Sequence, residues 1–143
     1  MNNPITIQAI ADAPIEVVWH CWISAEHIIH WNAASDDWHT PRATSDFKIG
    51  GTFSYRMEAK DGSFGFDLNG RFNHIEEHRF IAYSLEDDRK VEIEFEAKGD
   101  QTLITQRFEA ENINPRDLQQ TGWQAILNNF VKYAAAQQGS ISK

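Results

Sequence analysis

One long helical segment near the end of the chain limits the possible folds more than any other stretch. The segment Pro115–Gln138 reads PRDLQQTGWQAILNNFVKYAAAQQ, and its apolar residues recur with a helical period over several turns. They form two adjacent stripes, which are Leu118, Gly122, Ile126, Phe130 and Ala134 and, beside them, Trp123, Leu127 and Val131. A face of this width is typical of a helix packed against another layer, and at ~1.5 Å per residue it extends about 35 Å.

The residues at both ends of this segment favour a helix with defined limits. Asn114 is a good N-cap residue, Pro115 suits the first helical position, and Asp117 favours the positive end of the helix dipole. Gly139 suits the C-terminal end of the helix, since glycine commonly follows the last helical residue.

Most of the upstream chain alternates apolar and polar residues, which predicts β-strands. The expected strands are Ile5–Ala11, Thr52–Ala59, Phe64–Ile75, Phe80–Leu85, Val91–Glu96 and Leu103–Glu111. Asp61-Gly62 and Gly99-Asp100 indicate hairpin turns, and Gly70 indicates a bend or bulge inside a long strand. Consecutive hairpins make an antiparallel sheet whose dry face needs a cover, and the long helix supplies it.

Two short helices are expected after the first strand, over Ile15–Ile23 and from Ser24 to about Trp31. In the stretch Trp31–Ile49 the apolar residues follow neither the helical nor the strand period over a useful length. We therefore expect a partly ordered loop that covers one end of the domain. One more short strand hidden in that stretch is the alternative.

Three stretches carry a resemblance to a known family. They are WNAASDDWH (Trp31–His39), the run from Asp46 to Gly70, and GWQAILNNF (Gly122–Phe130). Together they resemble the family named for homology to the activator of the ninety-kilodalton heat-shock-protein ATPase, in the START-like (SRPBCC, Bet v 1-like) helix-grip superfamily. The resemblance spans almost the whole chain in order. It implies one α+β domain over residues 1–143, with a curved antiparallel sheet wrapped around a long C-terminal helix and a deep apolar pocket between them.

Composition argues against several classes of partner and indicates a cellular compartment. The net charge of −8 argues against nucleic acid and against an anionic membrane surface. No apolar run approaches the ~20 residues of a membrane span, and the N-terminus is unlike a signal peptide. Cys21 is the single cysteine and lies in an apolar run, so we expect an inert core thiol, a reducing compartment and a cytoplasmic protein. A monomer and a homodimer both remain open.

The candidate site is an apolar pocket with a few polar anchors, which is how proteins usually hold small molecules. The expected ligand-binding residues are Trp31, Trp38, Tyr55, Met57, Phe66, Tyr83, Arg89, Trp123 and Leu127. Trp31 and Trp38 are expected to close the mouth. Phe66 suits a core position better than a ligand contact, and Arg89 either points inward to fix an acidic group or, the favoured interpretation, reaches solvent at the end of its strand.

Neither catalytic nor metal-binding residues are predicted. Asp36, Asp37 and His39 suggest acid–base chemistry, but no nucleophile is spaced to work with them. His27 and His30 share a helical spacing, with His39 nearby in sequence, yet zinc usually needs further ligands and supporting groups. We therefore expect solvated histidines and no cofactor.

Three functions remain in view. The leading one is a non-enzymatic module that binds a small hydrophobic or aromatic molecule. The second is a cyclase- or hydrolase-like enzyme that acts on such a ligand, for which titratable groups with perturbed pKa values should converge in the pocket. The third is a chaperone-associated, stress-related interaction domain. In the resembling family the namesake activator binds a chaperone, but a chain of 143 residues leaves no room for its separate chaperone-binding domain.

Overall fold

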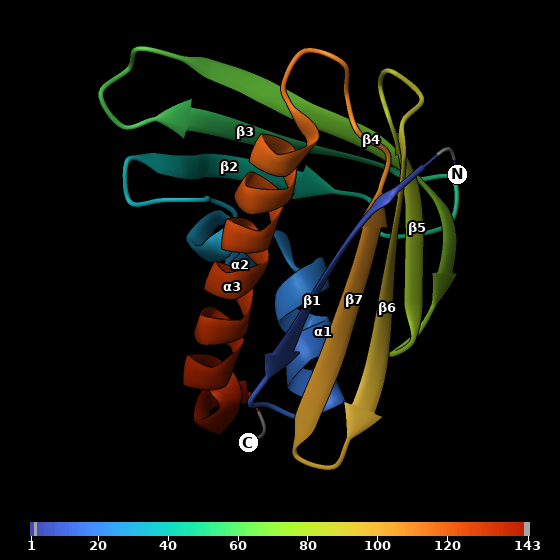
Figure 1. The fold of residues 1–143 in the computed structure, drawn as a ribbon. Coiled ribbons are helices and arrows are strands. Elements are labelled where there is room, and N and C mark those ends of the chain that lie inside the picture. The colour runs from blue at the N-terminus through green and yellow to red at the C-terminus, as the bar shows by residue number, and fades with distance from the viewer. Residues whose placement is uncertain (2, 142–143) are drawn as a thin grey trace.

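The computed structural model describes the backbone of residues 1 and 3–141 and the side chains of residues 1 and 3–137 (Figure 1). The elements in chain order are β1 (Ile5–Ala11), α1 (Ile15–Ile23), α2 (Ala25–Trp31), β2 (Trp38–Ser45), β3 (Thr52–Ala59), β4 (Gly65–Glu76), β5 (Phe80–Leu85), β6 (Lys90–Lys98), β7 (Gln101–Phe108) and α3 (Arg116–Ile141). No helix within the described residues is long and apolar enough to cross a membrane.

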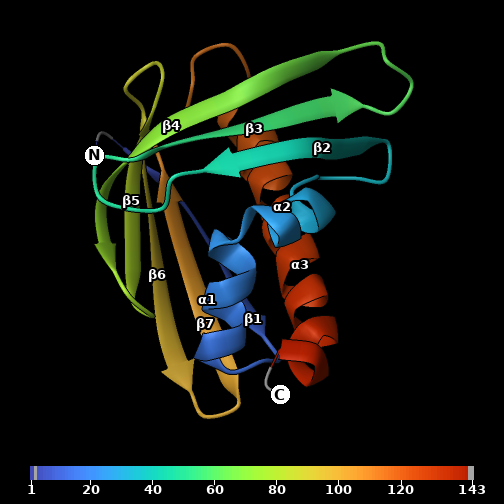
Figure 2. The same cartoon turned by 180° about the vertical axis from the view of Figure 1, so that it is seen from behind.

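The strands form one antiparallel sheet of seven strands in the order β1-β7-β6-β5-β4-β3-β2. The first strand pairs with the last, from Ile5 opposite Phe108 to Ala11 opposite Thr102. Figures 1 and 2 show β2, β3 and β4 running across one end of α3, while the other strands run along its length. This arrangement confirms the predicted helix-grip fold.

The sequence prediction was wrong about two details of the sheet. The stretch expected to be mainly a loop contains β2, a strand of eight residues, as the alternative allowed. The irregularity of β4 lies between Phe72 and His74, not at Gly70, which keeps regular partners in both neighbouring strands. A bulge bends a strand, so the shift at Phe72 lies where the sheet changes direction.

The middle of α3 packs into the main core. Leu127, Phe130 and Ala134 are almost completely buried. In contrast, Leu118 is 58% exposed, so the prediction that it lies on the buried stripe was wrong. The first turns of the helix therefore pack less completely than its middle, although Trp123 still stacks on Phe108 of β7 and Gln124 donates to the Gln8 carbonyl of β1 at 3.0 Å.

The predicted ends of α3 also need correction. The helix begins at Arg116, one residue after Pro115, and continues past Gly139 to Ile141. Asn114 donates its backbone N–H and its side-chain amide to Glu111, at 2.6 and 3.2 Å. The residue expected to cap the helix thus also holds the loop before it.

We expect Gly70→Ala to lower the free energy of unfolding by about 1–3 kcal/mol through overpacking. A Cβ atom at Gly70 would lie 2.5 Å from Cε2 of the buried Phe53 ring and 2.9 Å from the Ser84 carbonyl oxygen. Urea unfolding measures the loss. Since Phe53 is the main obstacle, the double variant with Phe53→Leu should lose less than the two single variants combined. Additive losses would contradict this explanation.

Candidate functional site: an apolar cavity between the sheet and α3

A cavity of about 430 Å³ lies between the sheet and the N-terminal half of α3. Its wall combines residues of α1, α2, five strands and α3, and most of them are apolar or aromatic. Trp123 of α3 stacks on Phe108 of β7, with ring centroids 3.9 Å apart and planes 9° from parallel. The curvature of the sheet thus leaves a space that aromatic side chains border.

Eight of the nine predicted ligand-binding residues line this cavity. They are Trp31, Tyr55, Met57, Phe66, Tyr83, Arg89, Trp123 and Leu127. Trp38 does not line it, because β2 is a strand and not a loop folded over the opening. Its ring lies 6.0 and 6.2 Å from the rings of Phe64 and Phe66, which are 61% and 39% exposed.

Trp31 forms part of the cavity wall and does not act as a cover at the mouth. The side chain is only 6% exposed, and its indole N–H donates to the Cys21 carbonyl at 3.0 Å. Its ring lies 5.1 Å from the Trp22 ring and 4.8 Å from the Phe130 ring. This aromatic cluster holds α1, α2 and α3 together at the edge of the cavity.

Two phenols and a guanidinium supply polar groups to the cavity. Burial raises the pKa of both Tyr55 and Tyr83 above the ordinary range, and the positive charge of Arg89 partly opposes the rise for Tyr83. Arg89 Nε donates to Asp87 at 2.6 Å, while the side chain also lines the cavity. Both tyrosines therefore stay protonated hydrogen-bond donors near a cation.

Sequence reasoning missed Gln106, Ser45 and Gln119, which also line the cavity. Gln106 is 6% exposed, between Ile104 and Phe108 on the inner face of β7. A polar residue within that apolar alternation was the available signal. The Ser45 hydroxyl is buried and has no hydrogen-bond partner among the described residues. Gln119 instead donates to the carbonyls of Glu111 and Asn114 and so orders the loop before α3.

Gly122 also lines the cavity and was overlooked as a site residue. A Cβ atom added there would meet nothing within 4 Å. Glycine inside a helix costs about 1 kcal/mol relative to alanine, so packing or stability does not explain this choice. Its effect is to keep the cavity wide beside Trp123.

The other residues considered from the sequence lie elsewhere. His39 is 3.7 Å from Glu58 on the neighbouring strand and, with Asp36, borders a separate hollow between α2, β2 and α3. His27 and His30 both contact Tyr133 of α3, through a hydrogen bond and a ring stack respectively.

Cys21 is completely buried, and burial raises the pKa of its thiol to about 11. It therefore remains a neutral thiol at neutral pH, as expected for a core residue.

The buried phenols predict a loss of stability at high pH. Above the ordinary tyrosine pKa of about 10, Tyr55 and Tyr83 release protons in the unfolded chain but keep them in the folded one. The free energy of unfolding should then fall by at most about 1.4 kcal/mol per pH unit for each tyrosine. Urea unfolding between pH 8 and 11 measures the slope. The double variant Tyr55→Phe, Tyr83→Phe should fall less steeply, and an equal slope in both proteins would refute the assignment.

Comparisons with known proteins agree with this architecture. The family described as "Activator of Hsp90 ATPase homolog 1-like protein" matches residues 12–135. An AHSA1-like protein from Aeromonas hydrophila is 39% identical, covers 92% of this chain and 93% of its own, and superposes with a TM-score of 0.83. For a protein from Cytophaga hutchinsonii the identity is 46%, the coverages are 95% and 94%, and the TM-score is 0.81.

A more distant structure, from Nitrosomonas europaea, shares only the fold, at 15% identity, coverages of 95% and 96%, and a TM-score of 0.81. The comparison with curated proteins finds no match. The match over residues 12–135 and the two closer structures establish that the chain belongs to the family of proteins like the activator of Hsp90 ATPase homolog 1.

Proposed function

We propose that this protein binds a small aromatic or other hydrophobic molecule in the cavity between the curved sheet and α3, as a binding module and not as an enzyme. The observation that carries this proposal is the cavity itself. Its volume of about 430 Å³ is within the usual range for small-molecule sites, and its wall is mainly apolar with a few polar groups. Family membership supports a ligand-binding domain in general terms.

The polar groups indicate the kind of ligand. Arg89 brings a positive charge to the cavity, and the protonated phenols of Tyr55 and Tyr83 are donors in the same region. Together they suit a carboxylate or another acceptor at one end of an otherwise apolar molecule. The stacked pair of Trp123 and Phe108 offers a flat surface to an aromatic ring.

The enzyme alternative rests on the same two phenols. Their perturbed pKa values meet the expectation of titratable groups converging in the pocket. However, a general acid or base works best with a pKa near the working pH, and burial moves both phenols away from neutrality. They suit holding a ligand better than transferring its protons.

A chaperone-associated role is the remaining alternative, and one surface feature favours it. Trp38, Phe64 and Phe66 form a small aromatic patch, with Phe64 and Phe66 exposed. Exposed aromatic clusters often mark protein contacts. A protein that binds no small molecule but loses a chaperone contact in Phe64→Ser would favour this role.

Filling the cavity should abolish binding without unfolding the protein. The probe is 2-naphthoate, followed by tryptophan fluorescence. Gly122→Leu should weaken its binding at least tenfold, because the new side chain enters the cavity where Gly122 leaves open space. The variant should keep the wild-type unfolding midpoint, since a helical glycine is replaced by a better helix former. Gly122→Ala, which adds one methyl group, is the matched control and should have a smaller effect.

Unchanged binding of 2-naphthoate by Gly122→Leu would place the ligand outside the cavity. Trp123→Ala gives a second check, because it removes the stacked surface and should weaken binding as well. Native mass spectrometry of protein from its own host then identifies any natural ligand that co-purifies.

Removing the cation should affect charged ligands selectively. Arg89→Met should weaken the binding of 2-naphthoate several-fold but leave the affinity for the uncharged 2-naphthamide almost unchanged. The reason is that only the carboxylate interacts with the guanidinium. Arg79→Met is the control, since Arg79 forms an exposed pair with Glu76 at 3.5 Å. Equal losses of affinity for both probes would mean that Arg89 shapes the cavity and does not bind the charged group of the ligand.

A further inference from the structure

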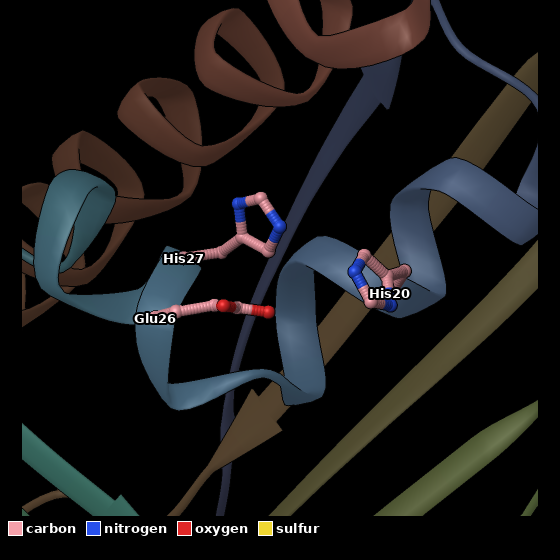
Figure 3. A group of neighbouring side chains, drawn as sticks. All are labelled: His20, Glu26 and His27. Carbon is pink, nitrogen blue, oxygen red and sulfur yellow. The ribbon is translucent and has the colours of Figure 1, made fainter. Parts of the chain in front are cut away.

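The corner between α1 and α2 gathers two histidines and one carboxylate (Figure 3). His20 lies in the last turn of α1, whereas Glu26 and His27 lie in the first turn of α2. Ser24 joins the helices, and its N–H donates to the His20 carbonyl at 3.2 Å. One potential ligand atom from each of the three side chains lies within 4.8 Å of the other two. Sequence spacing paired His27 with His30, but the fold pairs it with His20.

The side chains are oriented toward a common point. In Figure 3 the Glu26 carboxylate and one ring nitrogen of His27 point toward His20. The two imidazole centroids are 5.1 Å apart. His27 Nδ1 is 2.6 Å from the Tyr133 hydroxyl, and His20 Nδ1 is 3.5 Å from the Ser24 hydroxyl. Each histidine therefore keeps Nε2 for the space between the rings.

We propose that His20, Glu26 and His27 bind a divalent transition-metal ion of the zinc class, with water completing its coordination. Two imidazoles and one carboxylate are a ligand set that suits zinc and its neighbours in the first transition series. Ligand atoms on one such ion lie roughly 3–3.5 Å apart, given metal–ligand distances of about 2.1 Å. His20 and Glu26 are exposed, so their side chains are free to rotate toward a shared ion.

The contact with Tyr133 adds the support that metal-binding histidines usually have. Such a histidine commonly uses its second ring nitrogen for a hydrogen bond that fixes the orientation of the ring. The 2.6 Å contact between His27 Nδ1 and Tyr133 Oη provides this bond from α3. A histidine that merely faces solvent needs no such partner.

A bound ion would also act on the cavity from a distance. It would tie the end of α1 to the start of α2, and these helices supply Trp22, Ile23 and Trp31 to the cavity wall. Because the ion binds the folded corner, it would stabilise the native state by mass action. This proposal does not depend on the proposed small-molecule ligand, since it concerns different residues.

The test is calorimetric titration of the tag-free full-length chain with zinc chloride in a buffer that does not chelate metals. We expect one ion per chain and a higher unfolding midpoint in its presence. His20→Gln and Glu26→Gln should each weaken zinc binding at least tenfold and remove the rise in the midpoint. Both positions are exposed, so these variants should fold as the wild type does.

His30→Gln is the matched control, because His30 lies one turn further along α2 and stacks on the same Tyr133 ring, 5.9 Å away. It should bind zinc within twofold of the wild type. The proposal is overturned if the wild type binds no zinc, or if His20→Gln and Glu26→Gln bind it as tightly as the wild type. Loss of binding in His74→Gln instead would assign the ion to the outer face of the sheet.

Discussion

The rest of the structure depends on the uneven packing of α3. Its middle is buried through Leu127, Phe130 and Ala134. Phe130 touches the aromatic pair of Trp22 and Trp31, with ring centroids 4.7 and 4.8 Å away. This contact anchors the middle of the helix, so its first turns need not be fully packed to remain in place. A cavity can then persist beside the first turns of the helix, where a fully packed helix would have closed it.

The cavity wall combines a general scaffold with a few polar or small residues. The same fold recurs in a solved structure with only 15% identity, so the fold alone does not determine a ligand. Gln106, Arg89 and Gly122 are different, because each departs from what packing alone would select at its position. We therefore expect selectivity to lie in these three residues and the two phenols near Arg89.

Much of the fold was predictable because local pattern and final environment agree. The strands Thr52–Ala59 and Phe80–Leu85 match the prediction, since alternation along each strand reflects one buried face. β2 was less visible because it reads WHTPRATS, with polar residues and Pro41 typical of an edge strand, which is where it lies. The exposure of Leu118 could not be predicted, since helical periodicity defines a face but not how far the sheet follows it.

The candidate sites likewise contain residues that the local pattern predicts and residues whose positions depend on tertiary packing. Tyr55 and Tyr83 were found because strand parity determines which way they point. Trp38 was misplaced because its position depended on whether its segment was a loop or a strand. The contact between His20 and His27 depends on the angle between two helices around Ser24. Tertiary packing sets this angle, so residue spacing along the chain does not predict it.

The pairing of β1 with β7 has a consequence for synthesis on the ribosome. Ile5 emerges early, but its partner Phe108 is made only after most of the chain. Neither the sheet nor the cavity can be completed until β7 and then α3 have left the exit tunnel. Until then α1 covers the apolar side of β6, where the Trp19 and Trp22 rings lie 5.3 and 5.6 Å from the Phe95 ring. Folding therefore waits for long-range contacts, and the apolar surface that β7 and α3 bury stays exposed on the nascent chain until both have been made.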